Sequence, residues 1–132
     1  MLGEKWTMLI VRDAAAGKTR FSDFTDSLGV STDVLTDRLA TLVSAGVLER
    51  RSYRSDGSRM RFSYHLTEIG VELNTVLAAL TAWGDKHRPT EAGPSTFYRE
   101  VASKRPVTVS FLSEDGNILE PAQVEVAPIP RH

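Results

Sequence analysis

The feature that most constrains the fold is a pair of short amphipathic segments joined through Gly29-Val30-Ser31. In the second segment, Thr32 to Ala45, the apolar residues recur at i, i+4 and i+7, as on one face of a helix: Leu35, Leu39 and Leu42. Ser31 is suited to cap that helix, and Gly46 is suited to end it. Two helices with this turn chemistry between them predict a helix-turn-helix.

The chain before this motif is predicted to be helical as well, apart from a short extended piece at Thr19 to Phe21. Ser22 is expected to cap the helix that carries Phe24 and Leu28. The first helix, Lys5 to Ala16, has two apolar stripes, one made of Trp6, Leu9 and Ile10 and the other of Met8, Val11 and Ala15. Because one stripe suffices for the domain core, the second predicts contact with a partner subunit.

A β-hairpin and a long helix are predicted next. Val47 to Arg54 and Met60 to Leu66 alternate between apolar and polar residues on either side of a turn at Ser55 to Ser58. Thr67 is expected to cap one helix that runs to about Asp85 and carries a broad apolar face: Ile69, Leu73, Val76, Leu77, Leu80 and Trp83. This order predicts a mainly α fold with a small β-hairpin (α+β), a winged helix-turn-helix over residues 1–88.

Residues 89–132 are predicted to form a separate C-terminal extension, because proline and glycine pairs follow residue 87. The extension is expected to hold a short helix and a β-hairpin: the helix at Thr96 to Ser103, and strands at Val107 to Leu112 and Gln123 to Val126 around the turn Glu114-Asp115-Gly116-Asn117. We expect this hairpin to pack on the main domain or on a partner subunit.

Charge is distributed unevenly along a chain whose formal net charge is −1. Between residues 37 and 61, six arginines stand against three acids: Arg38, Arg50, Arg51, Arg54, Arg59 and Arg61 against Asp37, Glu49 and Asp56. Past Pro89 the acidic residues outnumber the basic ones. A nearly neutral total therefore conceals a local basic patch, which suits an anionic partner.

Several classes of function are disfavoured by what the sequence lacks. The chain has no cysteine, which excludes disulfides, thiolate zinc sites and thiol redox switches. His65, His87 and His132 are too scattered to predict a metal site, and no cofactor is expected. No nucleophile elbow, phosphate loop or dinucleotide fingerprint occurs, so catalysis is not predicted. No apolar run is long enough to cross a bilayer, which predicts a cytoplasmic protein without membrane contact.

Five separated motifs and the end of the last helix resemble the HxlR-type family of transcriptional regulators. The motifs are Gly3-Glu4-Lys5-Trp6-Thr7, Arg20-Phe21-Ser22-Asp23-Phe24, Leu35 with Arg38-Leu39, Gly46-Val47-Leu48-Glu49-Arg50 and Tyr64-His65-Leu66-Thr67-Glu68-Ile69-Gly70, followed by Trp83-Gly84. The resemblance covers roughly Leu2 to His87. It implies a bacterial or archaeal homodimeric repressor or activator whose first and last helices form the dimer. Such an interface would include Trp6, Met8, Val11, Leu73, Leu77, Leu80 and Trp83.

A protein of this kind is expected to bind double-stranded DNA. The second helix of a helix-turn-helix enters the major groove, so its first residues are predicted to face bases: Ser31, Thr32, Asp33 and Thr36. Arg38 is the residue best suited to reach a guanine or a phosphate. The hairpin arginines Arg54, Arg59 and Arg61, together with Ser22, are predicted to contact the DNA backbone. The leading hypothesis is thus a sequence-specific regulator that binds a roughly palindromic operator as a homodimer.

Other interpretations stay open at this point. The hairpin arginines also suit a solvated strand face, and Arg38 also suits an ion pair with Asp37. Trp6 and Trp83 would serve either as core and dimer anchors or as the lining of a pocket for an unidentified small-molecule effector. Because Asp33 and Asp37 repel phosphate, the alternative hypothesis is a winged-helix protein-interaction or ligand-sensing module that does not bind DNA.

Overall fold

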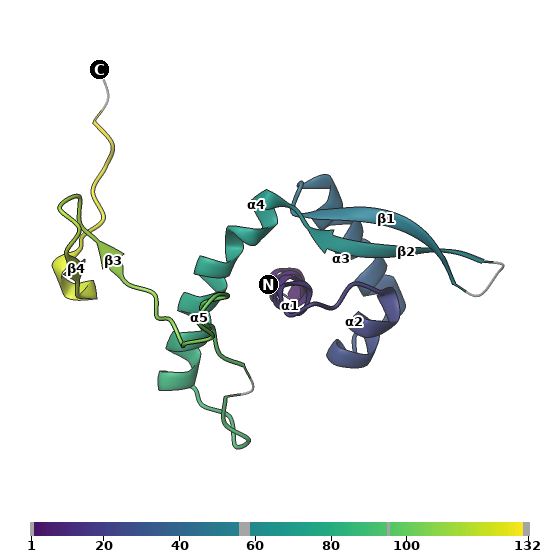
Figure 1. Cartoon of the computed structure of the whole chain (residues 1–132), viewed down its shortest axis with the longest axis horizontal. Coiled ribbons are helices and arrows are strands. Elements are labelled where there is room, and N and C mark those ends of the chain that lie inside the picture. The colour runs from purple at the N-terminus through teal and green to yellow at the C-terminus, as the bar shows by residue number, and fades with distance from the viewer. Residues whose placement is uncertain (1, 56–58, 95, 131–132) are drawn as a thin grey trace. The chain divides into compact units, whose positions relative to one another are not determined.

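The computed structural model of the chain describes residues 2–55, 59–94 and 96–130 (Figure 1). The chain divides into two compact units, residues 1–77 and residues 78–132. The first unit holds α1 (Leu2–Ala15), α2 (Phe21–Leu28), α3 (Thr32–Ser44), β1 (Leu48–Ser55), β2 (Arg59–Leu66), α4 (Glu68–Val71) and the start of α5 (Leu73–His87). This order of helix, helix-turn-helix, hairpin and helix confirms the predicted α+β winged helix. The two units divide within α5, after Leu77, whereas the predicted boundary lies just after the end of this helix at His87.

The core of the first unit is built mainly from α1, α2 and α3. Its buried apolar side chains are Ile10, Val11, Phe24, Leu35, Leu39, Leu42, Leu48 and Leu77. The three leucines of α3 are all buried, as their spacing predicts. Val11 differs from expectation, because it lies in this core with no exposed surface and not on a free second stripe of α1. Trp6, Met8 and Leu9 are half-buried.

The ends of the helix-turn-helix follow local capping rules. The Ser31 hydroxyl accepts a hydrogen bond from the Val34 amide at 3.3 Å, which caps α3 as predicted. Gly29 ends α2 in the left-handed conformation at φ 63°, where a side chain would be strained. Ser22 is not the cap of α2, because the helix already begins at Phe21. Arg20 is the N-cap residue, and the Asp23 carboxylate in the first turn accepts hydrogen bonds from the amides of Thr19 and Arg20.

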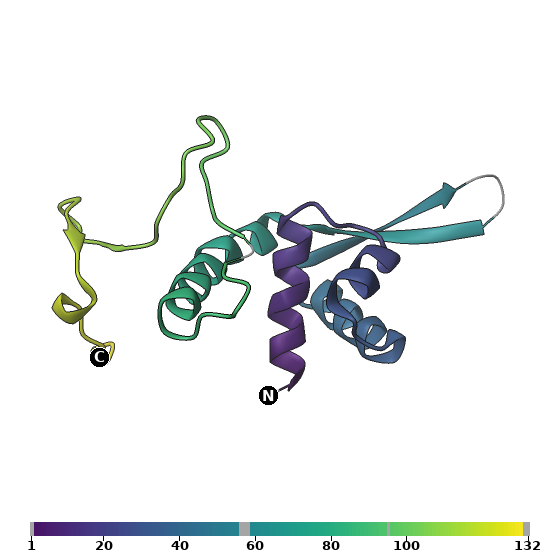
Figure 2. The same ribbon diagram turned by 90° about the horizontal axis from the view of Figure 1, so that it is seen from below.

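Strands β1 and β2 form an antiparallel hairpin whose register pairs Leu48 with Leu66 and Ser55 with Arg59. Figures 1 and 2 show the hairpin running from α1 out past α2. The predicted extended piece before α2 joins this sheet, since Arg20 forms an isolated bridge with Ser63 and the Tyr64 amide donates to the Thr19 carbonyl at 2.7 Å. Residues 56–58 of the predicted turn lie outside the described residues.

A joint at Thr67 connects the end of α3, the start of β1 and the start of α4. The Thr67 amide donates to the Val47 carbonyl at 3.1 Å, and its hydroxyl contacts the carbonyl oxygens of Gly46 and Val47. The same hydroxyl accepts from the Gly70 amide and so caps α4, as predicted. Gly70 packs so closely here that an added Cβ would lie 2.3 Å from the Val47 carbonyl oxygen. The single long helix that was expected is interrupted at Glu72, where α4 ends.

The second unit contains the remainder of α5 and the C-terminal extension. Its sheet is a hairpin whose strands have two residues each, β3 (Phe111–Leu112) and β4 (Ile118–Leu119), followed by the 3-10 helix η1 (Pro121–Gln123). The predicted turn at residues 114–117 is confirmed, because the Ser113 amide donates to the Asn117 carbonyl at 2.9 Å. The predicted strand at Gln123 to Val126 is wrong, and so is most of the predicted strand that ends at Leu112.

The predicted helix at Thr96 to Ser103 is wrong as well. The segment instead forms a tight turn in which the Lys104 amide donates to the Glu100 carbonyl at 2.9 Å and the Glu100 amide donates to the Arg105 carbonyl at 2.8 Å. Lys104 has a left-handed backbone with φ 64°, which no α-helix accommodates. In the part of the chain that the structure describes, no helix is both long and apolar enough to cross a membrane.

Candidate nucleic-acid interface

The outer face of α3 is open to solvent. Its leucines point into the core, so the opposite side of the helix presents the predicted base-contacting residues, all exposed: Ser31, Thr32, Asp33 and Thr36. The Ser31 hydroxyl is already engaged by the Val34 amide, so it has less capacity for an outside partner. Thr32, Asp33 and Thr36 are therefore the more available polar groups at the start of this helix.

Arg38 is held by its neighbour. Its guanidinium forms an ion pair and hydrogen bond with the Asp37 carboxylate, while the Thr41 hydroxyl donates to the Asp37 carbonyl at 3.0 Å. The Arg38 side chain is 30% exposed and that of Asp37 is 63% exposed. The ion pair weighed as an alternative is thus present in the unbound chain. Exposed pairs of this kind contribute at most about 1 kcal/mol, so Arg38 is able to exchange Asp37 for a stronger anion.

The hairpin arginines do not share one face. Because directly paired residues point to the same side of a sheet, the register puts Arg61 beside Tyr53 and Arg54 beside Met60 on the opposite side. Arg59 follows the Arg61 face by alternation. All three arginines are exposed, and none forms an ion pair or hydrogen bond with a described residue through its side chain. They are free positive charges on both faces of the hairpin.

Other hairpin arginines have internal partners. Arg51 pairs with Glu49 at 2.9 Å, which neutralises both. The Arg50 guanidinium lies over the Phe62 ring, 4.3 Å from its centroid, and that of Arg20 lies 4.9 Å from the centroid of the Tyr53 ring. These cation–π contacts orient the two arginines without removing their charge.

A groove between α3 and the hairpin includes a basic residue that was not predicted to contact DNA. The groove has a volume of about 310 Å³ and is lined by Thr36, Ala40, Val43, Ser44, Arg50 and Tyr64. Arg50 thus lies next to the exposed side of α3, where it lines the groove together with Thr36. The sequence places Arg50 in the basic patch, but only its pairing with Tyr64 in the hairpin register reveals which face it occupies.

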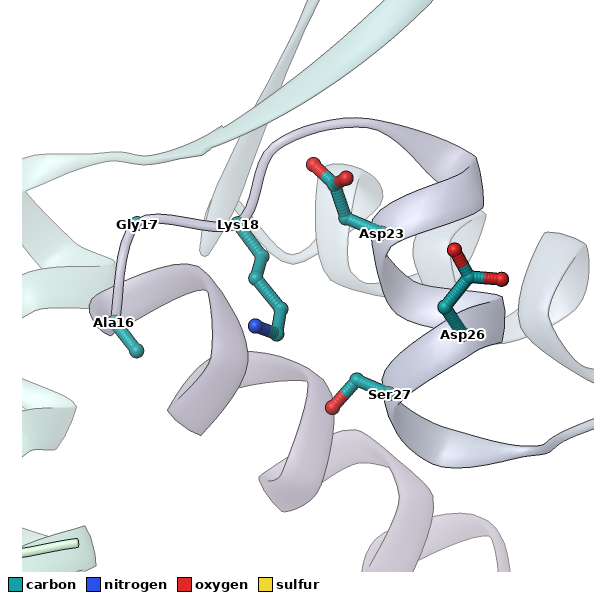
Figure 3. A pocket seen from close by; sticks show the side chains of 6 residues that line it. All are labelled: Ala16, Gly17, Lys18, Asp23, Asp26 and Ser27. Carbon is teal, nitrogen blue, oxygen red and sulfur yellow. The ribbon is translucent and has the colours of Figure 1, made fainter.

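A second hollow, of about 560 Å³, lies between the end of α1 and α2 and is shown in Figure 3. It is lined by Ala16, Gly17, Lys18, Asp23, Asp26 and Ser27, and Figure 3 shows the Lys18 side chain extending into the space between the two helices. The hydrogen bond from the Arg20 amide holds the pKa of Asp23 below its ordinary value of 3.8. The lining carries two carboxylates and one amine, so its net charge is negative, which disfavours the binding of a phosphate group.

The predicted backbone contact Ser22 lies in the first turn of α2 and is exposed. Its carbonyl accepts a hydrogen bond from the Thr25 hydroxyl at 3.0 Å. Ser22 and the hairpin arginines therefore belong to separate elements of the same unit. Among the described residues, no three His, Cys, Asp or Glu side chains gather where they would hold a metal ion.

The residues predicted for a dimer interface fall into two groups. Val11 and Leu77 are buried within the first unit, so their packing is accounted for by the chain itself. Trp6, Met8 and Leu73 are half-buried. Leu80 and Trp83 are 56% and 57% exposed on α5, and Trp83 is flanked by His87 and Arg88. Among the residues predicted for the interface, exposed apolar surface is therefore greatest on the second half of α5.

A capped helix-turn-helix with an open outer face, followed by an arginine-rich antiparallel hairpin, defines a winged helix-turn-helix protein of the transcription-regulator class. Residues 1–92 match the family model described as HxlR-like helix-turn-helix. The chain belongs to this family.

Relatives and solved structures agree with this assignment. The chain is 39% identical over 94 residues to Rv3095 of Mycobacterium tuberculosis, an uncharacterised HTH-type transcriptional regulator; the match covers 71% of the chain and 58% of that relative. The chain thus spans less than two thirds of the length of this relative. Its structure is similar to that of PA1374, a candidate transcription factor of Pseudomonas aeruginosa, with a TM-score of 0.71, 37% identity and coverage of 99% and 88% of the two chains. It is also similar to PA1607, another candidate transcription factor, with a TM-score of 0.77, 33% identity and coverage of 92% and 84%.

Proposed function

We propose that this chain is a cytoplasmic, sequence-specific DNA-binding regulator of transcription that acts as a homodimer on a roughly palindromic operator. The observation that carries the proposal is the exposed outer face of α3, which is anchored from behind by three buried leucines. A helix held in this way presents its first residues to the major groove without any rearrangement of the core. Thr32, Asp33 and Thr36 then lie at the base edges, where Asp33 suits a cytosine amino group.

Arg38 is the proposed main determinant of sequence. To reach a guanine it must leave Asp37, at a cost of no more than about 1 kcal/mol for an exposed pair. A bidentate contact with guanine contributes about 1–3 kcal/mol of discrimination, so the exchange is favourable at the correct base. At an incorrect base Arg38 stays with Asp37. The ion pair would therefore sharpen specificity, because it removes a free charge that would bind any phosphate.

The hairpin arginines supply attraction to the DNA backbone. Arg54, Arg59 and Arg61 are unpaired among the described residues, so they lose no internal contact when they meet phosphates. Their placement on both faces suits a hairpin that lies along a groove with a phosphate chain on either side. Arg50, beside α3, and Ser22, at the start of α2, are further proposed contacts. These groups would position α3 on the DNA and would contribute little to discrimination between base sequences.

The homodimer is proposed to form through α5, with Trp6, Met8 and Leu73 as further predicted contacts. The exposed side chains of Leu80 and Trp83 are one helical turn apart and form one apolar face. In a two-fold dimer each copy would cover this face of its partner. A two-fold dimer then requires an inverted repeat whose half-site centres are about 10 base pairs apart, or a multiple of that.

The proposal is tested by fluorescence anisotropy with labelled duplexes from the DNA that flanks the gene. We expect one duplex to bind at least about 10³-fold more tightly than a scrambled duplex of the same composition. Arg38→Ala should lower the affinity for the specific duplex by 1–3 kcal/mol and leave the scrambled duplex almost unchanged. The matched control is Arg105→Ala, which removes an exposed arginine from the extension. Equal binding of all sequences by the unmodified protein contradicts the proposal.

One observation favours a second candidate, a winged-helix module that binds a protein or a ligand in place of DNA. Two arginines of the basic patch, Arg38 and Arg51, are already neutralised by Asp37 and Glu49. The three unpaired hairpin arginines weigh against this candidate. The second candidate predicts that the affinity for any duplex stays weak even at 50 mM salt, where electrostatic attraction is stronger than at physiological salt.

A further inference from the structure

The hairpin of the C-terminal extension exposes an apolar face with no partner in its own unit. Leu112 and Ile118 are directly paired across β3 and β4, so their side chains lie on the same side of the sheet. They are 68% and 71% exposed. A hairpin with two residues in each strand is not stable alone in water, because it buries too little surface to offset its ordering. This face therefore needs a covering surface.

The second half of α5 has one covered side and one open side. Ala78, Thr81, Ala82 and Asp85 line a groove of about 200 Å³ together with Thr96, Phe97, Tyr98, Val107, Thr108 and Val109 of the same unit. The extension thus already lies along that side of the helix. Leu80 and Trp83 are on the other side and stay exposed. The unit presents two apolar surfaces, the hairpin face and the open side of α5.

The area on α5 is too small to hold a dimer by itself. A stable interface buries about 800 Å² on each partner. At their exposed fractions Leu80 and Trp83 offer on the order of 100 Å² each. On the hairpin face, Leu112 and Ile118 add on the order of 300 Å², so the apolar total is on the order of 500 Å². Because only a little more than half of a typical interface is apolar, a dimer that included this face would be of about standard size.

Charge points to a second copy of the chain as the occupant. The hairpin turn carries Glu114 and Asp115, whereas Lys86 and Arg88 outnumber Asp85 at the end of α5, where Arg88 lies over the Trp83 ring. No ion pair joins these two groups in the single chain among the described residues. The same chain thus offers both an acidic rim around one apolar face and a basic rim around the other, as a two-fold contact requires.

We propose that the C-terminal extension is a dimerisation arm, whose Leu112 and Ile118 pack on a second copy of this chain. The inference rests on the proposed homodimer and names the surface that makes it stable. The similarity to PA1374 extends over 99% of the chain, so the extension is part of an architecture found in another protein. The family model ends at residue 92, so the arm is an addition to the family's shared segment.

The first test measures the dimer dissociation constant of the full chain by sedimentation equilibrium, without DNA. Leu112→Asp with Ile118→Asp should raise this constant at least about 100-fold, because each substitution acts twice in a symmetric dimer. The matched control is Asn117→Asp with Ala122→Asp, which adds the same charge at exposed positions of the extension outside β3 and β4. It should change the constant less than about threefold. A hydrophobic-face variant that dimerises like the control, or an unmodified chain that stays monomeric, overturns the proposal.

The second test avoids a disruptive substitution and uses the absence of cysteine from the chain. Leu112→Cys introduces a single thiol, and Asn117→Cys, at an exposed position of the turn, serves as its control. In the dimer the Leu112→Cys thiol should react with a maleimide at least about 10-fold more slowly than in the dilute monomer, while the control thiol reacts at the same rate at both concentrations. Equal rates for the Leu112→Cys thiol above and below the dissociation constant would count against the arm.

Failure of the arm is distinguishable from failure of DNA binding. A duplex with a single half-site needs only one subunit, so the Leu112→Asp, Ile118→Asp variant should bind it with unchanged affinity. The same variant should lose at least about 10-fold affinity for the complete inverted repeat. If the unmodified protein dimerises through the arm but binds no duplex specifically, the proposed function fails while the arm stands.

Discussion

The salt dependence of DNA binding follows from the number of free arginines on the hairpin. Arg54, Arg59 and Arg61 are exposed and unpaired among the described residues, which gives six in a dimer. If each neutralises one phosphate, the logarithm of the binding constant should fall against the logarithm of salt concentration with a slope of about −5. Between 50 and 200 mM salt the affinity should therefore fall about 10³-fold, or roughly 4 kcal/mol.

Substitution of two of these arginines tests the count. Arg59→Ala with Arg61→Ala removes four of six contacts from the dimer, so the slope should drop to about −2. Anisotropy titrations of one labelled duplex at four salt concentrations measure it. Arg99→Ala with Arg105→Ala, in the extension, removes the same charge and should leave the slope unchanged. A slope that does not respond to the hairpin substitutions, or that responds equally to the control, refutes the assignment of the hairpin as the phosphate-binding element.

Three further predictions concern stability and specificity. Gly70→Ala should lower the free energy of unfolding by about 1–3 kcal/mol in urea titrations, because the new methyl group meets a backbone carbonyl, whereas Gly84→Ala meets open space and should be neutral or stabilising. The pKa of Asp23 is lowered in the folded protein, so its ionised carboxylate stabilises the fold above about pH 5, and this contribution is lost as pH falls through the folded-state pKa. Asp23→Asn should remove this part of the loss of stability in acid, as measured by urea titrations at successive pH values. Asp37→Ala should free Arg38 and tighten binding to a scrambled duplex more than to the operator, which competitive anisotropy would detect.

The helix-turn-helix is predictable because its rules are local. The leucine spacing of α3 fixes the buried face, the Ser31 side chain satisfies a helix amide, and Gly29 adopts a left-handed backbone. Each of these depends on a few neighbouring residues. The missed cap at Ser22 has a local cause too: the Asp23 carboxylate accepts hydrogen bonds from the amides of Thr19 and Arg20, and the helix begins two residues earlier than a Ser22 cap would allow.

The extension is less predictable because alternation describes side-chain environment and not backbone pairing. Val107, Val109 and Phe111 alternate with polar residues, yet only the last of them pairs with another strand. The same limitation applies to the hairpin arginines. Which of them share a face depends on the register between β1 and β2, and register is set by the turn and by packing beyond the strands.

The joint at Thr67 has a mechanical consequence. One side chain holds the carbonyl oxygens that follow α3 and also caps α4, while Gly70 rests against the same carbonyl with no space to spare. A tilt of α4 would therefore also shift the backbone that follows α3, the helix proposed to contact DNA. The close contact at Thr67 and Gly70 thus couples the position of α4 to that of α3.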